Sequence, residues 1–284
     1  MVKRVLGSDG VDLCIETFGD PADPTILLIS GLTASMDWWD EEFCTRLADQ
    51  ERHVIRYDHR DTGESTSSPA GHPSYTGHDL ATDTLRVLDA CDVTTAHFVG
   101  VSAGGAMAQV VAAHHPQRVL TLTLIATSPA GERSSKHPLP RSEPRVAKTF
   151  EEPAPDPPWD DRDAVVEYLV EGERPYAGTL GFDAERVRTK ATAVVARTVD
   201  MAASVANHWL ADEDPRDRFC MSDISVPTLV LHGTADPMFP LAHGEALAAG
   251  IPGARLVPLA GMGHEVPPPQ LWDVVIREVV EHTG

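Results

Sequence analysis

Val99-Gly100-Val101-Ser102-Ala103-Gly104-Gly105 is the stretch from which the fold of this chain can be predicted. An apolar run at 96–99 precedes it, and a helix-favouring run at 106–111 follows it. The pattern Gly-x-Ser-x-Gly between a strand and a helix is typical of a nucleophile elbow, a turn so sharp that glycine is needed beside the serine. A bare Gly-x-Ser-x-Gly arises by chance in chains rich in small residues, so its position between a strand and a helix is the informative part. The sequence therefore predicts Ser102 as an exposed nucleophile.

The composition fits one large α/β domain, because 284 residues with 42% hydrophobic and 23% charged side chains can bury a sizeable core. A formal net charge of −20 argues against nucleic acid or an anionic membrane as a partner and favours a self-repelling monomer or homodimer. The sequence shows neither a signal peptide nor an apolar run that could span a bilayer, so we expect a cytoplasmic protein. Scattered cysteines predict free thiols and no metal site: Cys14, Cys44, Cys91 and Cys220.

Strand and helix signals alternate along the chain. Alternating apolar and polar residues at 11–18 predict a half-buried antiparallel strand, and continuous apolar runs predict strands buried on both faces. Such runs lie at 26–29, 53–57, 96–99, 119–125, 227–232 and 254–259. Helical spacing lies between them, at about 38–49, 77–91, 161–171, 183–210, 241–249 and 270–282. This alternation predicts an α/β fold with a mostly parallel sheet.

The character of the sequence changes after Ser128. Residues 129–158 are rich in proline and mixed in charge, which argues against regular core structure there. Helical candidates follow at 161–171 and 183–210, before strand signals resume at Val226. We interpret this part of the chain as an inserted lid or cap over the site, with a disordered linker as the alternative.

A base and an acid for Ser102 can be sought after the later strands. Asp236 and His264 each follow a strand, so both should emerge at the edge of the sheet that carries Ser102. The order Ser, Asp, His is that of α/β-hydrolases, with His264 as the general base and Asp236 as the residue that orients it. Asp236 could instead cap a helix before Pro237. Poorer candidates for the acid are aspartates that no strand precedes: Asp212, Asp214 and Asp223.

The remaining parts of the site are predicted from loops that follow strands. The backbone N–H of Ala103 and that of Leu32 would form an oxyanion hole. The substrate pocket is expected to include Gly31, Trp38, Trp39 and Met262, although the tryptophans could equally be plain core. The charged run at 58–61, Asp-His-Arg-Asp, could be a second acid–base cluster, but we interpret it as a structural turn whose charges pair with one another.

At this point the sequence resembles the α/β-hydrolase superfamily over its whole length, and within it the group that contains aclacinomycin methylesterase. The resemblance rests on residues 18–24, on 53–65, on the elbow and on 258–264. Many members of the superfamily have Asp-x-Arg-Gly-x-Gly-x-Ser after the fourth strand, whereas this chain has Asp61 at the first of those glycines. It also has Ser30-Gly31 where His-Gly is commoner.

The resemblance implies an α/β-hydrolase fold with an eight-stranded, mostly parallel sheet flanked by helices. The core would comprise residues 1–128 and 223–284, and a helical cap, residues 129–222, would shape the pocket. It further implies a serine carboxylic-ester hydrolase that needs no cofactor or metal and takes a small-molecule ester. Similar enzymes cleave the methyl ester of an anthracycline or open the lactone ring of a macrolide, both through an acyl-enzyme. The length of the cap favours a bulky polyketide ester.

Other functions fit the same residues. A cofactor-free haloperoxidase or perhydrolase and an acyltransferase would share the triad, and would differ in using peroxide or an acceptor alcohol in place of water. Dehalogenases and epoxide hydrolases of this fold need Asp at the elbow, so Ser102 argues against them. Some members of the fold are non-catalytic binding proteins, but these tend to have lost a triad residue.

Overall fold

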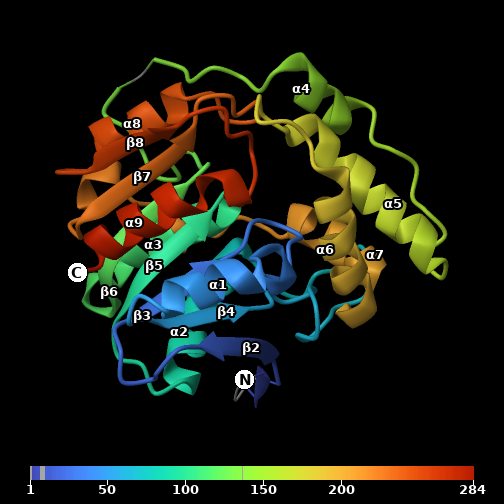
Figure 1. Ribbon diagram of the computed structural model, residues 1–284, viewed down its shortest axis with the longest axis horizontal. Coiled ribbons are helices and arrows are strands. Elements are labelled where there is room, and N and C mark those ends of the chain that lie inside the picture. The colour runs from blue at the N-terminus through green and yellow to red at the C-terminus, as the bar shows by residue number, and fades with distance from the viewer. Residues whose placement is uncertain (1, 7–9, 136) are drawn as a thin grey trace.

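The computed structural model describes residues 2–6, 10–135 and 137–284. Its centre is an eight-stranded sheet in the order β1-β2-β4-β3-β5-β6-β7-β8 (Figure 1). The strands are β1 (Val2–Leu6), β2 (Asp12–Phe18), β3 (Thr25–Ile29), β4 (His53–Tyr57), β5 (Ala96–Val101), β6 (Val119–Ile125), β7 (Thr228–Gly233) and β8 (Arg255–Leu259). The pairs β1–β2 and β2–β4 are antiparallel and the others are parallel. The predicted α/β fold with a mostly parallel sheet flanked by helices is confirmed.

Helices cover both faces of the sheet, which is why the central strands are buried and largely apolar. In β3, Leu27 and Ile29 pack on one side of the sheet, while Ile26 and Leu28 pack on the other. Helices α2 (Gly77–Ala90), α3 (Ala103–His114) and α8 (Ala242–Gly250) join the first cluster. Helices α1 (Glu41–Ala48) and α9 (Trp272–His282) join the second. The core on both faces holds the sheet in place, so the carboxyl ends of the parallel strands lie together at one edge of the sheet.

Four further helices lie together beside this core, α4 (Pro144–Glu151), α5 (Arg162–Glu173), α6 (Ala184–Arg197) and α7 (Met201–Leu210) (Figure 1). Helices α5 and α6 form a small apolar cluster of their own that includes Val165, Val170 and Val194. None of the described helices has the length and apolarity needed to cross a bilayer.

Three local features differ from the expectations. The helix expected at 183–210 is interrupted at 198–200, because Asp200 caps α7 by accepting the Ala203 N–H at 3.0 Å. The segment 129–158 contains α4, which Pro144 can begin because the first helical residue needs no amide hydrogen. Strand β1 was not expected, and it pairs with β2 at the edge of the sheet.

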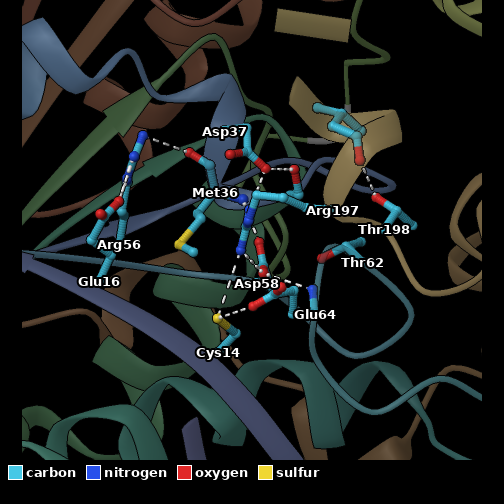
Figure 2. Close-up of polar contacts among 12 residues, drawn as sticks. Cys14, Glu16, Met36, Asp37, Arg56, Asp58, Thr62, Glu64, Arg197 and Thr198 are labelled. Atoms are coloured by element: carbon cyan, nitrogen blue, oxygen red, sulfur yellow. Dashed lines mark hydrogen bonds and ion pairs between the residues drawn. The ribbon is translucent and has the colours of Figure 1, made fainter. Parts of the chain in front are cut away.

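Arg197, at the end of α6, ties that helix to the core. Its guanidinium lies between two carboxylates, contacting Asp37 and reaching Asp58 at 2.8 Å (Figure 2). Asp58 is fully buried and also accepts the backbone N–H groups of Met36 and Glu64. Burial raises the pKa of Asp58, and Arg197 opposes that rise. A carboxylate buried this deeply depends on its cation, so α6 is held firmly against the core.

Two further cations on the same side of α6 contact the core. Both Arg186 and Lys190 reach the carboxylate of Asp40, at 2.6 and 2.7 Å, and the Lys190 ammonium also donates to the Trp38 carbonyl at 2.7 Å. Residues 186, 190 and 197 are spaced so that they share one helix face. We call this face, made of Arg186, Lys190 and Arg197, the cationic face of α6.

The charged run at 58–61 does not pair with itself, so that expectation is wrong. Arg60 instead makes a two-pronged salt bridge with buried Asp83, at 2.7 and 2.8 Å. Asp61 accepts hydrogen bonds from the Tyr75 hydroxyl at 2.5 Å and the Asn207 amide at 2.9 Å. Its φ of 63° is a left-handed conformation, which aspartate adopts more readily than most residues with a side chain. The run therefore joins distant elements together.

Candidate active site

Ser102 lies at the turn between β5 and α3 with φ 52° and ψ −123°, a strained conformation for a residue with a side chain. The glycines around it are required by close contacts. A Cβ on Gly100 would lie 2.4 Å from the Gly104 carbonyl oxygen, and one on Gly104 would lie 2.4 Å from that of Ile29. The Ser102 carbonyl is held by the Thr127 hydroxyl at 2.6 Å. The local structure is thus a tight strand–turn–helix with Ser102 at its apex.

A continuous hydrogen-bonded chain joins Ser102 to His264 and Asp236. The Ser102 Oγ lies 2.9 Å from His264 Nε2, and His264 Nδ1 lies 3.0 Å from Asp236 Oδ2. Asp236 Oδ1 accepts the backbone N–H groups of Met238 and Phe239, at 2.9 and 2.8 Å, which leaves Oδ2 to the imidazole. These contacts fit a neutral imidazole with its proton on Nδ1 and its lone pair facing the serine hydroxyl.

Asp236 was also considered as a helix cap, and the structure gives it a different local role. Helix α8 begins at Ala242, after Leu241, so Asp236 lies well before it. Its two backbone contacts close the turn after β7 and hold the carboxylate in place. Two of the poorer candidates for the acid have other partners: Asp214 pairs with Arg216, and Asp223 accepts the Cys220 N–H. Asp212 lies beside Thr76, where its backbone carbonyl accepts the Gly77 N–H.

The imidazole of His264 is held from several sides. The Phe239 ring meets it edge-on at 5.2 Å, and the backbone N–H of His264 donates to the Tyr176 carbonyl at 2.9 Å. His232, fully buried, lies 3.8 Å from Asp236 Oδ2 and hydrogen-bonds the Phe239 carbonyl. Burial lowers the pKa of His232, so it stays neutral and does not compete with His264 for the carboxylate.

The two residues whose backbone N–H groups are predicted to form an oxyanion hole, Leu32 and Ala103, both line the cavity at Ser102. Ala103 is the first residue of α3, whose leading N–H groups have no partner within the helix. Leu32 follows β3 in the loop 30–33, and a Cβ on neighbouring Gly31 would lie 3.4 Å from that of Ser102. This loop is held by two histidines: His59 Nε2 contacts the Ser30 carbonyl at 3.1 Å, and His208 Nδ1 accepts the Thr33 N–H at 2.8 Å.

A cavity of about 450 Å³ opens in front of Ser102 and His264. Gly31, Leu32, Ala103 and Trp38, which we expected at the site, lie in its wall on the core side. On the side of α5–α7 the wall is mostly apolar: Leu169, Val187, Val194, Met201, Val205 and Trp209. A cavity of this size whose wall is largely apolar is typical of a small-molecule site.

Two residues predicted for the pocket lie elsewhere. Trp39 is fully buried in the core under the sheet, with its ring stacked on Phe43 at 5.7 Å. Met262 is also fully buried there, and its carbonyl accepts the Ala235 N–H. Because Trp38 and Trp39 are consecutive, their side chains diverge, and only Trp38 reaches the cavity. Trp39 and Met262 are therefore structural.

Charged groups from α5 and α6 also border the cavity, and the sequence analysis missed them. Glu173 and Lys190 line it, together with Arg186 and Glu265. Burial raises the pKa of Glu173 to about 7 and lowers that of Lys190 to about 8. In the sequence these residues look like ordinary charges on amphipathic helices, so nothing marked them before the helices were placed.

Replacing Glu173 with glutamine should make thermal stability less dependent on pH. The cost of burying the carboxylate is nearly absent below pH 4.5 and is complete above pH 7, because the folded protein holds the proton more tightly than the unfolded chain. Glu173→Gln removes that cost. We expect its melting temperature to exceed that of the parent by about 2–4 °C at pH 8.5 and to match it near pH 5. Scanning calorimetry at both pH values checks this, with exposed Glu185→Gln as the control. Equal shifts of the melting temperature at both pH values would contradict the raised pKa of Glu173.

Comparison with known protein families matches residues 24–268 to the alpha/beta hydrolase fold. Among curated proteins, the chain is 34% identical to rhodomycin D methylesterase DauP of Streptomyces sp. (strain C5), over 94% of this chain and 93% of that protein. It is 33% identical, with the same coverage, to rhodomycin D methylesterase DnrP of Streptomyces peucetius.

Solved structures give the same fold. A hydrolase from Pseudomonas aeruginosa PA01 superposes with a TM-score of 0.73 at 27% identity, covering 100% of this chain and 98% of that one. The enol-lactonase from Burkholderia xenovorans LB400 superposes with a TM-score of 0.71 at 26% identity, covering 99% of both chains.

Proposed function

The chain belongs to the α/β-hydrolase fold family and is a carboxylic-ester hydrolase, and from that premise we propose that it cleaves the methyl ester of a bulky polyketide through an acyl-enzyme on Ser102. The observation that carries the mechanism is the hydrogen-bonded chain from Ser102 through His264 to Asp236 at the cavity. The relatives named for rhodomycin D favour a methyl ester over a macrolide lactone.

In the first half of the proposed reaction, His264 Nε2 removes the Ser102 hydroxyl proton as Oγ attacks the ester carbonyl carbon. Asp236 stabilises the resulting imidazolium and keeps its orientation. The carbonyl oxygen becomes an alkoxide that accepts hydrogen bonds from the N–H groups of Ala103 and Leu32. Each of these hydrogen bonds lowers the barrier by about 3 kcal/mol. The intermediate then breaks the bond to the methoxy oxygen, which takes the proton from His264 and leaves as methanol.

In the second half, a water molecule replaces methanol. His264 removes a proton from this water, whose oxygen attacks the acyl carbon of the Ser102 ester. The second alkoxide uses the same two N–H groups. Its collapse releases the free carboxylic acid, and Ser102 Oγ regains its proton from His264. The cycle therefore consumes one water per ester and needs no other reactant.

We also propose that residues 129–222 act as the cap that selects the substrate, over a core of 1–128 and 223–284. Helices α5, α6 and α7 supply the apolar wall opposite Ser102. Such a wall suits the flat apolar body of an aromatic polyketide, whose burial would favour binding by about 25 cal/mol per Å². Arg186 and Lys190, by pairing with Asp40, hold this wall over the reacting centre.

The proposal is tested by mass spectrometry of the purified protein incubated separately with four esters. These are an anthracycline methyl ester, a fourteen-membered macrolide, a sixteen-membered macrolide and p-nitrophenyl butyrate. We expect the anthracycline to lose one methylene equivalent, with incorporation of ¹⁸O from labelled water into the product acid. Gain of one water by a macrolide would mean lactone opening instead. Turnover of p-nitrophenyl butyrate alone would contradict the polyketide substrate.

A further inference from the structure

His208, from α7, contacts the loop that carries the proposed oxyanion N–H of Leu32. Its Nδ1 accepts the backbone N–H of Thr33 at 2.8 Å, and its Nε2 lies 2.7 Å from the Arg60 carbonyl. A carbonyl can only accept, so the ring proton lies on Nε2 and the lone pair on Nδ1. Burial lowers the pKa of His208, which keeps the ring neutral and preserves that lone pair.

The loop that His208 contacts needs such support. Thr33 has φ 63°, a left-handed conformation that a residue with a branched side chain rarely adopts. The Ala34 N–H reaches the Gly31 carbonyl only at 3.4 Å, a weak closure for so tight a turn. The hydrogen bond to His208 fixes the peptide between Leu32 and Thr33. It thereby restricts the rotation of Leu32, the residue whose own N–H must point at the reacting oxygen.

His208 is itself firmly held. Only 4% of it is exposed, and its ring meets those of His59 and Tyr75 edge-on at 5.9 and 6.1 Å. The adjacent Asn207 is fully buried, and its side chain accepts the Gly71 N–H at 2.7 Å and donates to Asp61 at 2.9 Å. Helix α7 is therefore anchored on the core at two consecutive residues.

The same helix also touches the substrate cavity. Met201, Val205 and Trp209 are four residues apart, so they form one stripe of α7, and all three line the cavity. His208 lies beside this stripe and reaches the loop 30–33. One helix thus connects the wall that contacts the substrate with the loop that contacts the reacting oxygen.

We propose that His208 is a positioning residue that aims the Leu32 N–H at the developing alkoxide, so that the oxyanion hole is complete only when α7 is docked. This inference rests on the proposed function. The two ring nitrogens of His208 bond the Thr33 N–H and the Arg60 carbonyl, so His208 acts on Leu32 through the Thr33 peptide. Its effect should therefore appear in the chemical step rather than in substrate binding.

The experiment compares His208→Asn with His208→Gln. The side-chain oxygen of asparagine stands near the place of Nδ1 and can still accept the Thr33 N–H. The longer glutamine can still donate to the Arg60 carbonyl but offers no acceptor at the Nδ1 place. We expect His208→Gln to lower kcat on p-nitrophenyl butyrate about 100-fold with KM within about twofold, the loss that follows removal of one oxyanion donor. We expect His208→Asn to retain kcat within about fivefold.

A second measurement uses a trifluoromethyl ketone, which Ser102 converts to an oxyanion adduct. Its inhibition constant should rise in His208→Gln in parallel with the fall in kcat/KM, while that of a non-reactive amide analogue should stay constant. His243→Gln is the control, because His243, like His208, is bonded through both ring nitrogens, but its partners are the Ser128 hydroxyl and the Pro140 carbonyl rather than the loop 30–33. We expect His243→Gln to leave the inhibition constants of the ketone and of the amide unchanged.

Melting temperatures show which variants are folded, and His208→Ala replaces His208→Gln if the latter does not fold. Equal losses in the asparagine and glutamine variants, or none in either, would overturn the inference. Ser102→Ala is assayed beside these variants, and if it hydrolysed p-nitrophenyl butyrate at the rate of the parent, the proposed function itself would be wrong. An inactive Ser102→Ala beside unaffected His208 variants would reject the role of His208 alone.

Discussion

Replacing Ser102 with alanine is expected to lower kcat for ester hydrolysis by about 10⁴- to 10⁶-fold while leaving the fold intact. The hydroxyl oxygen forms the bond to the acyl group, so no other atom of the hydrogen-bonded chain can take over its role. The Oγ lies 2.9 Å from His264 Nε2, and removing it costs the fold this one side-chain hydrogen bond. Turnover of p-nitrophenyl butyrate, followed by the absorbance of the released p-nitrophenolate, measures the loss. Circular dichroism verifies the fold.

Ser128→Ala is a matched control for this variant. Ser128 also lines the cavity, but its hydroxyl contacts His243 at 2.8 Å instead of His264. We expect it to keep kcat within about threefold, as for a side chain outside the chemical step. Residual hydrolysis by Ser102→Ala at the rate of the parent would show that another nucleophile acts, and it would remove the basis of the acyl-enzyme mechanism.

Replacing Asp236 with asparagine is expected to lower kcat by about 10⁴-fold, although the two side chains have nearly the same shape. The asparagine oxygen can still accept the N–H groups of Met238 and Phe239, so the turn after β7 should persist. Its NH₂ group would then face His264 Nδ1 as a donor. That contact places the ring proton on Nε2, facing Ser102, and the imidazole can no longer accept the hydroxyl proton.

The loss in Asp236→Asn is measured from single-turnover acylation and from kcat, with Asp223→Asn as the control. Asp223 also follows the cap segment and accepts one backbone N–H, but it lies away from His264. Only the first variant should slow acylation. A loss of merely twofold would place the orienting acid elsewhere in the chain. We expect both variants to keep the melting temperature of the parent, and a crystal structure of Asp236→Asn to show the turn after β7 unchanged.

The arrangement of the triad could be predicted because it follows from strand order. Ser102, Asp236 and His264 each lie in the turn or loop that follows a strand, and parallel strands end at one edge of the sheet. Their proximity therefore required no knowledge of packing. The largely apolar runs of β3 to β7 were equally informative, because such runs are typical of strands buried on both faces. The roles of these three residues remain predictions for the experiments above.

Other features depend on contacts between distant parts of the chain, which local patterns do not encode. Trp38 and Trp39 look alike in sequence. Only the packing of α6 against Trp38 shows that Trp38 belongs to the cavity and Trp39 to the core. Arg197 pairs with Asp58 across 139 positions, so neither could be assigned a partner in advance. His208 is one of 13 histidines, and only the docking of α7 brings it to Thr33.

The cationic face of α6 also suggests how substrate range can be redesigned. Since Arg186, Lys190 and Arg197 meet carboxylates of the core, a foreign insertion that preserves these three charges should dock in the same place. Chimeras that also keep Asn207 and His208 could then exchange the residues of 129–222 that line the cavity. With the cap proposed above, the core and His208 would supply the hydrolytic chemistry and the grafted residues the choice of ester, so the choice of ester could be changed while the chemistry is kept.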